Sequence, residues 1–149
     1  MKKIKIVLAA VICSVFALTS CSNDDDSGVG ASIVGKWNPQ QTVTSVGTAN
    51  QPAEPYVNNQ VSCGKDYIEF ADPSILKNVV WNKDADGVCS ETPGTVGAWA
   101  KTGDVVTVTG GSFAGTYKVT RLTGSELRLA ETGTIGGVAV TTTIYFAKI

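Results

Sequence analysis

The chain has 149 residues, with 12 Lys or Arg, 13 Asp or Glu and no His, so its formal net charge is −1. This length predicts one domain with a real hydrophobic core, and near neutrality without a basic stripe argues against a nucleic-acid partner. The absence of histidine excludes His-dependent general base chemistry, Ser-His and Cys-His nucleophiles, and imidazole metal ligands.

Residues 1–20 have the layout of a secretory signal. Three lysines within the first five residues precede an apolar run at 6–18, and a small residue, Ser20, stands directly before Cys21. The apolar run has 13 residues, whereas crossing the hydrocarbon core of a membrane takes about 20. A transmembrane helix is therefore the weaker interpretation of this segment.

The tetrapeptide Leu18-Thr19-Ser20-Cys21 resembles the lipobox of bacterial lipoproteins, in which the cysteine is acylated and the chain is cut before it. The resemblance implies that residues 1–20 are a lipoprotein signal peptide and that Cys21 carries palmitate-type acyl chains. It also implies a lipid anchor in the cell outer membrane, facing either the periplasm or the cell surface. Several acyl chains on one residue hold a membrane more firmly than a single chain, which binds only marginally. An ordinary secreted protein with a cysteine near its cleavage site is the alternative.

Residues 21–30 are expected to form an acidic, flexible tether. Asp24-Asp25-Asp26 and the small residues after them bury no apolar surface, so a solvated spacer is predicted. An acidic patch soon after the acylated cysteine also resembles the surface-export signals of Bacteroidota lipoproteins. Both interpretations stay open.

From residue 31 onward the sequence predicts an all-β domain. It has no sustained 3.6-residue period, and short runs rich in Val, Thr, Ile, Tyr and Trp are separated by Gly, Asp, Asn and Pro. Short glycine-bearing connections at 101–104, 109–111 and 123–125 predict hairpins, and hence an eight-stranded antiparallel up-and-down meander. The expected strands are 33–44, 66–71, 76–82, 95–101, 105–109, 115–122, 126–131 and 139–148.

Alternation in the second half of the chain predicts one packed and one solvated face. The residues of the packed face are Val106, Val108, Tyr117, Val119, Leu127, Leu129, Ile144 and Phe146. Eight such strands remove their exposed edges by closing into a barrel. A barrel of that size is either filled by side chains or holds one small ligand.

The order of several short motifs over residues 31–149 is similar to that in lipocalin-like domains on Bacteroidota lipoproteins. These motifs are Gly35-Lys36-Trp37, Cys63 before an apolar strand, Cys89 after the next hairpin, Gly97-Ala98-Trp99, and a Thr-rich last strand ending at Lys148. The resemblance implies a lipocalin-like β-barrel that binds a small apolar ligand without catalysis or a cofactor. The segment 45–60 departs from the pattern, and we interpret it as a floppy insertion in preference to a lid.

Cys63 and Cys89 are the cysteines that remain once Cys13 is cut away and Cys21 is acylated. In the oxidising conditions beyond the inner membrane they are predicted to form a disulfide. Closing a loop of this size stabilises the fold by at most about 3.5 kcal/mol. A catalytic thiol is the alternative, but the chain has no histidine to generate the thiolate.

No metal site is expected. The run 82–87 resembles the first half of a calcium loop, but its twelfth position is Pro93 where the loop needs a glutamate, so we interpret it as a polar turn. Asp66 and Glu69 are three residues apart, and in a strand they face opposite sides and cannot act together on one substrate. Both are expected to be surface charges.

The three tryptophans are the remaining candidates for a ligand site. Trp37 is expected to be a core plug at the closed end of the barrel. Trp81 and Trp99 are candidate ligand-binding residues, although a core position is the preferred interpretation of Trp99. The small residues Gly97, Ala98 and Ala100 are expected to leave room beside Trp99. If the barrel is filled, the alternative function is a structural or interaction subunit that docks another envelope protein.

Overall fold

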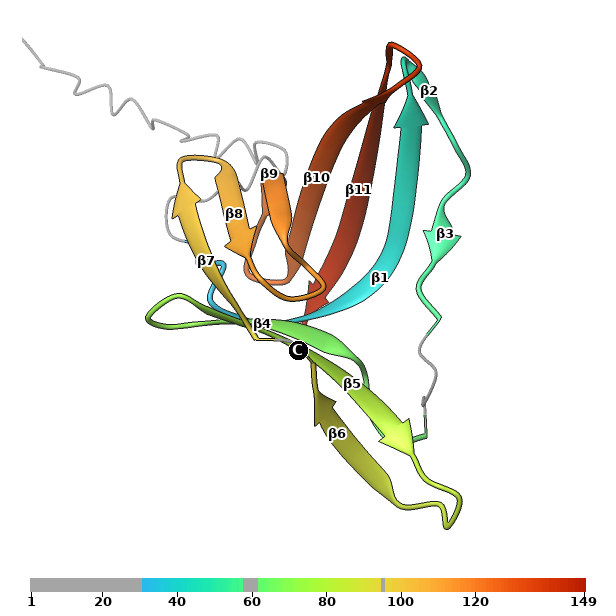
Figure 1. Ribbon diagram of the computed structural model, residues 1–149, viewed down its shortest axis with the longest axis vertical. Helices are drawn as coiled ribbons and strands as arrows, with labels where there is room; N and C mark the ends of the chain where they lie inside the picture. The colour runs from blue at the N-terminus through green and yellow to red at the C-terminus, as the bar shows by residue number, and fades with distance from the viewer. Residues whose placement is uncertain (1–30, 58–61, 95) are drawn as a thin grey trace, which may run out of the picture.

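The computed structural model describes residues 31–57, 62–94 and 96–149, which form strands, turns and loops (Figure 1). The strands are β1 Gly35–Val46, β2 Ala49–Asn50, β3 Glu54–Pro55, β4 Tyr67–Ala71, β5 Ile75–Lys83, β6 Cys89–Pro93, β7 Gly97–Thr102, β8 Val105–Thr109, β9 Gly115–Leu122, β10 Glu126–Ile135 and β11 Val138–Lys148. None of the described residues belongs to a helix with the length and hydrophobicity needed to cross a bilayer. The expected signal peptide, Cys21 and the acidic tether lie outside the described residues.

Eight of the strands close into a barrel. In the order β1, β4, β5, β7, β8, β9, β10 and β11, each pairs antiparallel with the next, and β11 returns to β1. This closed arrangement confirms the predicted eight-stranded meander. The joins are uneven, because β5 and β7 share two residue pairs whereas β10 and β11 share ten.

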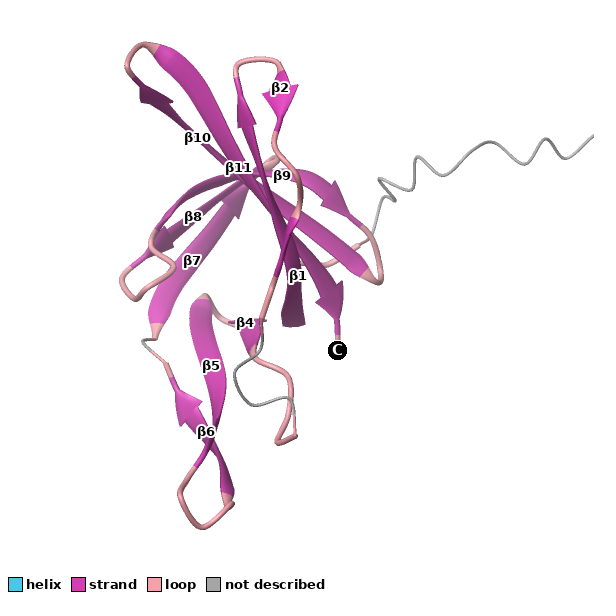
Figure 2. Cartoon of the chain, turned by 90° about the vertical axis from the view of Figure 1, so that its right-hand side faces the viewer, coloured by secondary structure: helices cyan, strands magenta, loops and turns pink. Residues whose placement is uncertain are grey.

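Three strands extend beyond the barrel as an arm, which comprises residues 43–46 and 131–142. β10 pairs with β9 through residues 127–130, and past that point it pairs with β11 alone. Figures 1 and 2 show β10, β11 and β1 rising together out of the barrel. The arm makes β10 longer than predicted. Its tip is the two-residue turn Gly136-Gly137, in which both glycines have the positive φ that a tight hairpin requires.

The segment after β1 corrects a prediction. Interpreted above as a floppy insertion, it turns at Gly47 and runs back along β1 as β2 and β3. The amide of Gln51 donates to the carbonyl of Thr44 at 2.8 Å, and the amide of Tyr56 donates to that of Gln40 at 2.9 Å. We call residues 49–57 the strap. These backbone bonds hold the strap along β1, and residues 58–61 lie outside the description.

The inner face of the barrel is filled at the end where β1 begins. Trp37 and Phe70 are fully buried there, and Val106, Leu127 and Leu129 are fully buried elsewhere on the inner face, which confirms the predicted packed face and the core position of Trp37. The indole Nε1 of Trp37 donates to the carbonyl of Ile33 at 2.7 Å, and the ammonium of Lys148 lies 5.2 Å from the indole ring. The side chains around Trp37 are therefore closely packed.

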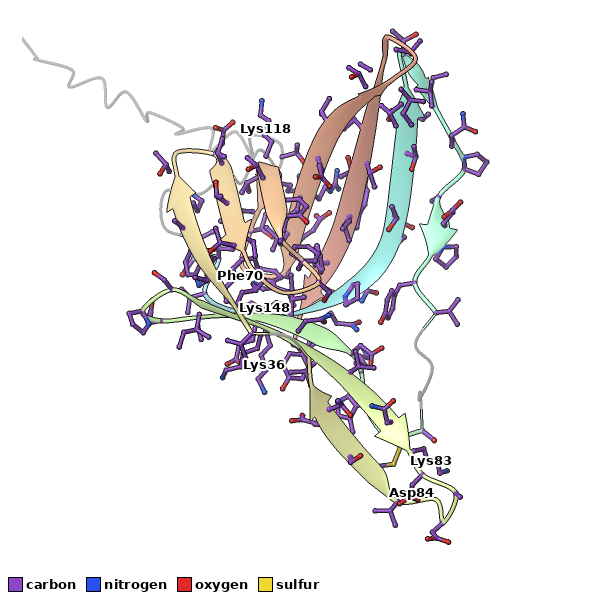
Figure 3. The ribbon with its side chains drawn as sticks, in the orientation of Figure 1. Lys36, Phe70, Lys83, Asp84, Lys118 and Lys148 are labelled. Carbon is purple, nitrogen blue, oxygen red and sulfur yellow. A yellow bond between two sulfur atoms is a disulfide. The ribbon has the colours of Figure 1, made fainter. Side chains whose placement is uncertain are left out.

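The hairpin of β5 and β6 projects away from the barrel (Figures 1 and 2). The predicted disulfide between Cys63 and Cys89 is present, with 5.3 Å between the Cα atoms, and it lies near Lys83 and Asp84 in Figure 3. It joins the stretch before β4 to the first residue of β6. The sequence did not predict β6, because its residues lack an alternating apolar pattern.

Candidate functional site

A cavity of about 290 Å³ lies at the mouth of the barrel, between β1 and β11 on one side and β4 and β5 on the other. Its apolar wall consists of Ile68, Val80, Phe113, Ile144 and Phe146. Ile144 and Phe146 belong to the face predicted to point inward. Because ligand pockets in proteins start at about 300 Å³, this cavity suits a small organic molecule. We call it the mouth cavity.

Phe113 forms part of the wall because the loop between β8 and β9 folds over the barrel. Its ring stacks on Tyr117 with 4.8 Å between centroids and meets Phe146 edge-on at 6.3 Å. The hydroxyl of Tyr117 donates to the carbonyl of Phe113 at 3.2 Å. Across the barrel, the side-chain amide of Asn78 donates to the hydroxyl of Ser112 at 3.1 Å. These contacts hold the loop against the mouth.

The polar side of the mouth cavity is built on Asp66. Its side chain is almost fully buried, with 2% of the residue exposed. The hydroxyl of Tyr56, from the strap, donates to Oδ2 at 2.6 Å, and the backbone amide of Trp81 donates to Oδ1 at 2.8 Å. The side-chain amide of Asn38 donates to the carbonyl of Asp66 at 2.6 Å. The carboxylate is thus held by the strap and by β5, and a side chain of β1 holds the backbone carbonyl of the same residue.

The environment of Tyr56 changes its acidity. Burial raises the pKa of the Tyr56 phenol, and its hydrogen bond to the Asp66 carboxylate and the negative charge of that group raise it further. The phenol therefore keeps its proton at neutral pH and donates to Asp66. The strap is bound to the barrel by this bond as well as by its backbone.

Asp66 corrects a second prediction. Asp66 and Glu69 do face opposite sides of the sheet, and Glu69 forms an ion pair with Lys77 on the outer side, with 3.2 Å between Nζ and Oε2. Asp66, however, is buried and not a surface charge. The reason is that the strap, whose path the sequence does not reveal, places Tyr56 beside it.

The two tryptophans proposed as ligand-binding residues do not line the mouth cavity. Trp99 packs edge-on against Phe70 with 5.3 Å between centroids, and its indole nitrogen donates to the carbonyl of Ala71 at 3.1 Å. It lines a separate, open groove of about 490 Å³ together with residues 31–34. Ala98 and Ala100 are exposed, so they leave no room inside the barrel, but Ala100 does line the open groove beside Trp99.

Trp81 lies on the projecting part of β5, where its ring packs closely over Gly64. A Cβ atom at Gly64 would come within 2.5 Å of the indole, so this approach requires glycine. Trp81 contributes to the mouth cavity only indirectly, through the backbone amide that it donates to Asp66. A ligand-binding role for the Trp81 and Trp99 side chains stays a prediction.

In the acidic turn after β5, an aspartate side chain accepts hydrogen bonds from backbone amides of the same turn. Oδ1 of Asp84 accepts from the amide of Asp86 at 3.0 Å and from that of Val88 at 2.7 Å, as expected for a polar turn. Within residues 31–57, 62–94 and 96–149, no three Cys, Asp or Glu side chains gather into a possible metal site.

Comparison with known proteins gives a family match. The lipocalin-like domain family matches residues 33–129. The bovine lipocalin allergen Bos d 2 is 17% identical over 77% of this chain and 71% of its own, with a TM-score of 0.40. A deswapped triple mutant of bovine odorant-binding protein is 13% identical over 77% and 72%, also with a TM-score of 0.40. No curated protein sequence matches the chain. Because the family match spans more than half of its length, the chain belongs to the lipocalin-like domain family.

Proposed function

We propose that the domain binds a small, mostly apolar molecule in the mouth cavity and performs no catalysis on it. The observation that carries this proposal is the cavity itself, whose apolar wall faces one buried polar group, Asp66. Most ligand pockets combine a largely apolar lining with a few fixed polar groups in this way. Membership of the lipocalin-like domain family supports the same function. The packed cluster around Trp37 and the volume of the mouth cavity both favour a short ligand.

A titration with the neutral fluorophore N-phenyl-1-naphthylamine tests the proposal. The probe should bind at a single saturable site, with a rise in emission as it leaves water. Val80→Phe fills the cavity from β5 and should weaken binding by at least about tenfold, since the larger ring takes the ligand's space. Trp99→Phe distinguishes the mouth cavity from the groove beside Trp99, because this substitution should not change the affinity of a ligand bound in the mouth cavity.

The control is Ile135→Ala on the arm, where the side chain is 72% exposed, and it should leave the affinity unchanged. Circular dichroism should confirm that every variant keeps the strand content of the parent. Emission that does not saturate, or an affinity that a folded Val80→Phe variant does not change, would contradict binding in the mouth cavity. If Trp99→Phe changes the affinity instead, the ligand binds in the groove beside Trp99.

A docking subunit is the second candidate function, and the arm favours it. Three apolar residues that share one face of the arm, Val46, Ile135 and Val138, are 40%, 72% and 46% exposed. Replacing Ile135 and Val138 together by Ser should weaken docking, as measured by photo-crosslinking from position 46 in intact cells. Unchanged crosslinking in the double variant would contradict docking through the arm. If the probe also binds saturably, ligand binding is the function that remains.

We also propose that the domain is carried on a lipid-anchored lipoprotein of the cell envelope, because Leu18-Thr19-Ser20-Cys21 follows an apolar run of signal-peptide length. Cys21→Ser should release the protein from the membrane fraction or leave it as an unprocessed precursor. Cys13→Ser, within the part that is cut away, is the matched control and should leave processing unchanged. Intact-mass analysis that finds an unmodified Cys21 in the native protein would contradict the anchor.

A further inference from the structure

The charge of the mouth cavity is carried by one buried group, the carboxylate of Asp66. A carboxylate has about four lone-pair positions for hydrogen bonds, and donors among the described residues use two of them, the hydroxyl of Tyr56 and the amide of Trp81. Both donors are neutral. Hydrogen bonds from neutral groups orient a buried carboxylate and reduce its desolvation cost, but they leave its net charge in place.

No cation offsets this charge within the described part of the chain. The residues that line the mouth cavity include no Lys or Arg, and the four ion pairs of the described residues all involve other carboxylates. The ammonium of Lys36 is engaged with Tyr67 on the outer side of the sheet, 4.4 Å from the ring centroid. Figure 3 shows Lys36 and Phe70 on opposite sides of β4. The cavity is thus apolar, with one negative group.

We propose that the mouth cavity selects apolar molecules that carry a protonated amine and rejects those that carry a carboxylate. This inference rests on the proposed function and names the ligand class for the same site. An ammonium group beside Asp66 supplies the missing opposite charge and up to three hydrogen-bond donors. A fatty-acid-like carboxylate would bring a second negative charge into a poorly solvated site, where repulsion is stronger than in water.

The surrounding polar groups fit a donor better than an acceptor. One N–H of the Asn78 side chain donates to Ser112, and the oxygen of the same amide is an acceptor. Thr42 adds a hydroxyl oxygen from β1 on the other side of the cavity. Asp66, Asn78 and Thr42 together offer oxygen acceptors to an ammonium. The apolar body of the ligand then packs against Phe113 and Ile144.

The test compares three ligands with one apolar body and different polar heads: 1-naphthylmethylamine, 1-naphthalenemethanol and 1-naphthaleneacetate. Affinities are measured near neutral pH by displacement of N-phenyl-1-naphthylamine and by calorimetry. The amine should bind at least about tenfold more tightly than the alcohol, and the carboxylate should bind most weakly. Asp66→Asn should reduce the affinity for the amine to that for the alcohol and improve the affinity for the carboxylate.

Glu69→Gln is the matched control, because it removes one negative charge from the outer face of β4, the strand that follows Asp66, and should leave the ligand order unchanged. If Asp66→Asn does not fold, the NMR signal of the Trp81 backbone amide in the unmutated protein replaces this variant, since that amide donates to Asp66. Its NMR shift should change more with the amine than with the alcohol.

The outcomes separate this inference from the proposed function. If neither the three ligands nor the neutral probe binds, the proposed function fails and the inference fails with it. If the ligands bind but the carboxylate or the alcohol matches the amine, the cavity is a binding site and head-group selection is overturned. The same conclusion follows if the Trp81 amide responds equally to amine and alcohol.

Discussion

At the scale of single residues, the hydrogen bond between Tyr56 and Asp66 joins the strap to the barrel wall. Tyr56→Phe should lower the free energy of unfolding by about 1–2 kcal/mol, because it removes a hydrogen bond to a charged, buried acceptor from a residue that is itself 41% exposed. Urea denaturation measures the loss. Tyr145→Phe makes the same chemical change on β11 and should have a smaller effect, so an equal loss in both variants would contradict the special role of Tyr56.

The raised pKa values of Tyr56 and of a second tyrosine, Tyr117, predict a loss of stability in alkaline solution. Burial raises the pKa of Tyr117 and, together with Asp66, that of Tyr56. The folded state therefore holds these phenol protons more tightly than the unfolded chain, whose tyrosines titrate near pH 10. Their contribution is complete below about pH 10 and is lost as the pH rises through the higher folded-state values. Denaturation curves across this range should show the decline, and the double variant Tyr56→Phe, Tyr117→Phe should show less of it.

The disulfide gives a residue-scale prediction of its own. Replacing Cys63 and Cys89 by Ser should lower the free energy of unfolding by up to about 3.5 kcal/mol, since the bond restricts the unfolded chain. Thermal unfolding of oxidised and reduced protein provides the same comparison without mutation. Labelling of both thiols in the unreduced protein would instead contradict the bond.

At the scale of elements, β10 has two different environments along one strand. Leu129 is fully buried in the barrel, whereas Ile135 is 72% exposed on the arm. Leu129→Ala should therefore cost about 2–5 kcal/mol of unfolding free energy and Ile135→Ala less than about 0.5 kcal/mol. Chemical denaturation of the two variants checks this contrast. Similar losses at both positions would indicate that the face of the arm around Ile135 is covered in solution.

The sequence could predict the strands that alternate and not those that depend on their neighbours. The alternation of Val106 with Val108 and of Leu127 with Leu129 indicates a strand with one buried face, and the structure confirms both. β2, β3 and β6 have no such pattern. They are extended because β1 or β5 offers them backbone partners. Thr132-Gly133-Thr134 likewise resembles a loop in sequence and is a strand because β11 lies beside it.

At the scale of the whole molecule, the site could be predicted only in part. Ile144 and Phe146 were expected to point inward, and they line the mouth cavity. The sequence did not indicate that Asp66 and Tyr56 belong to the site. The hydrogen-bond partner of the buried carboxylate lies on the strap, ten residues away, and no pattern next to Asp66 in the sequence indicates this contact. Phe113 had a usable signal, as an isolated aromatic residue within a glycine-rich connection. Whether space remains between such side chains depends on packing of distant strands, which local patterns do not reveal.

The pairing of β1 with β11 constrains the order in which the molecule can fold. The register places Trp37 opposite Lys148 and Val46 opposite Val140, so the first strand of the barrel is completed only by the last strand of the barrel. Local hairpins such as β7–β8 and β10–β11 can form early, because their loops are short. Until the last strand arrives, one edge of β1 has no barrel partner and is open to wrong pairing. A growing chain is thus exposed to wrong pairing until β11 has been made.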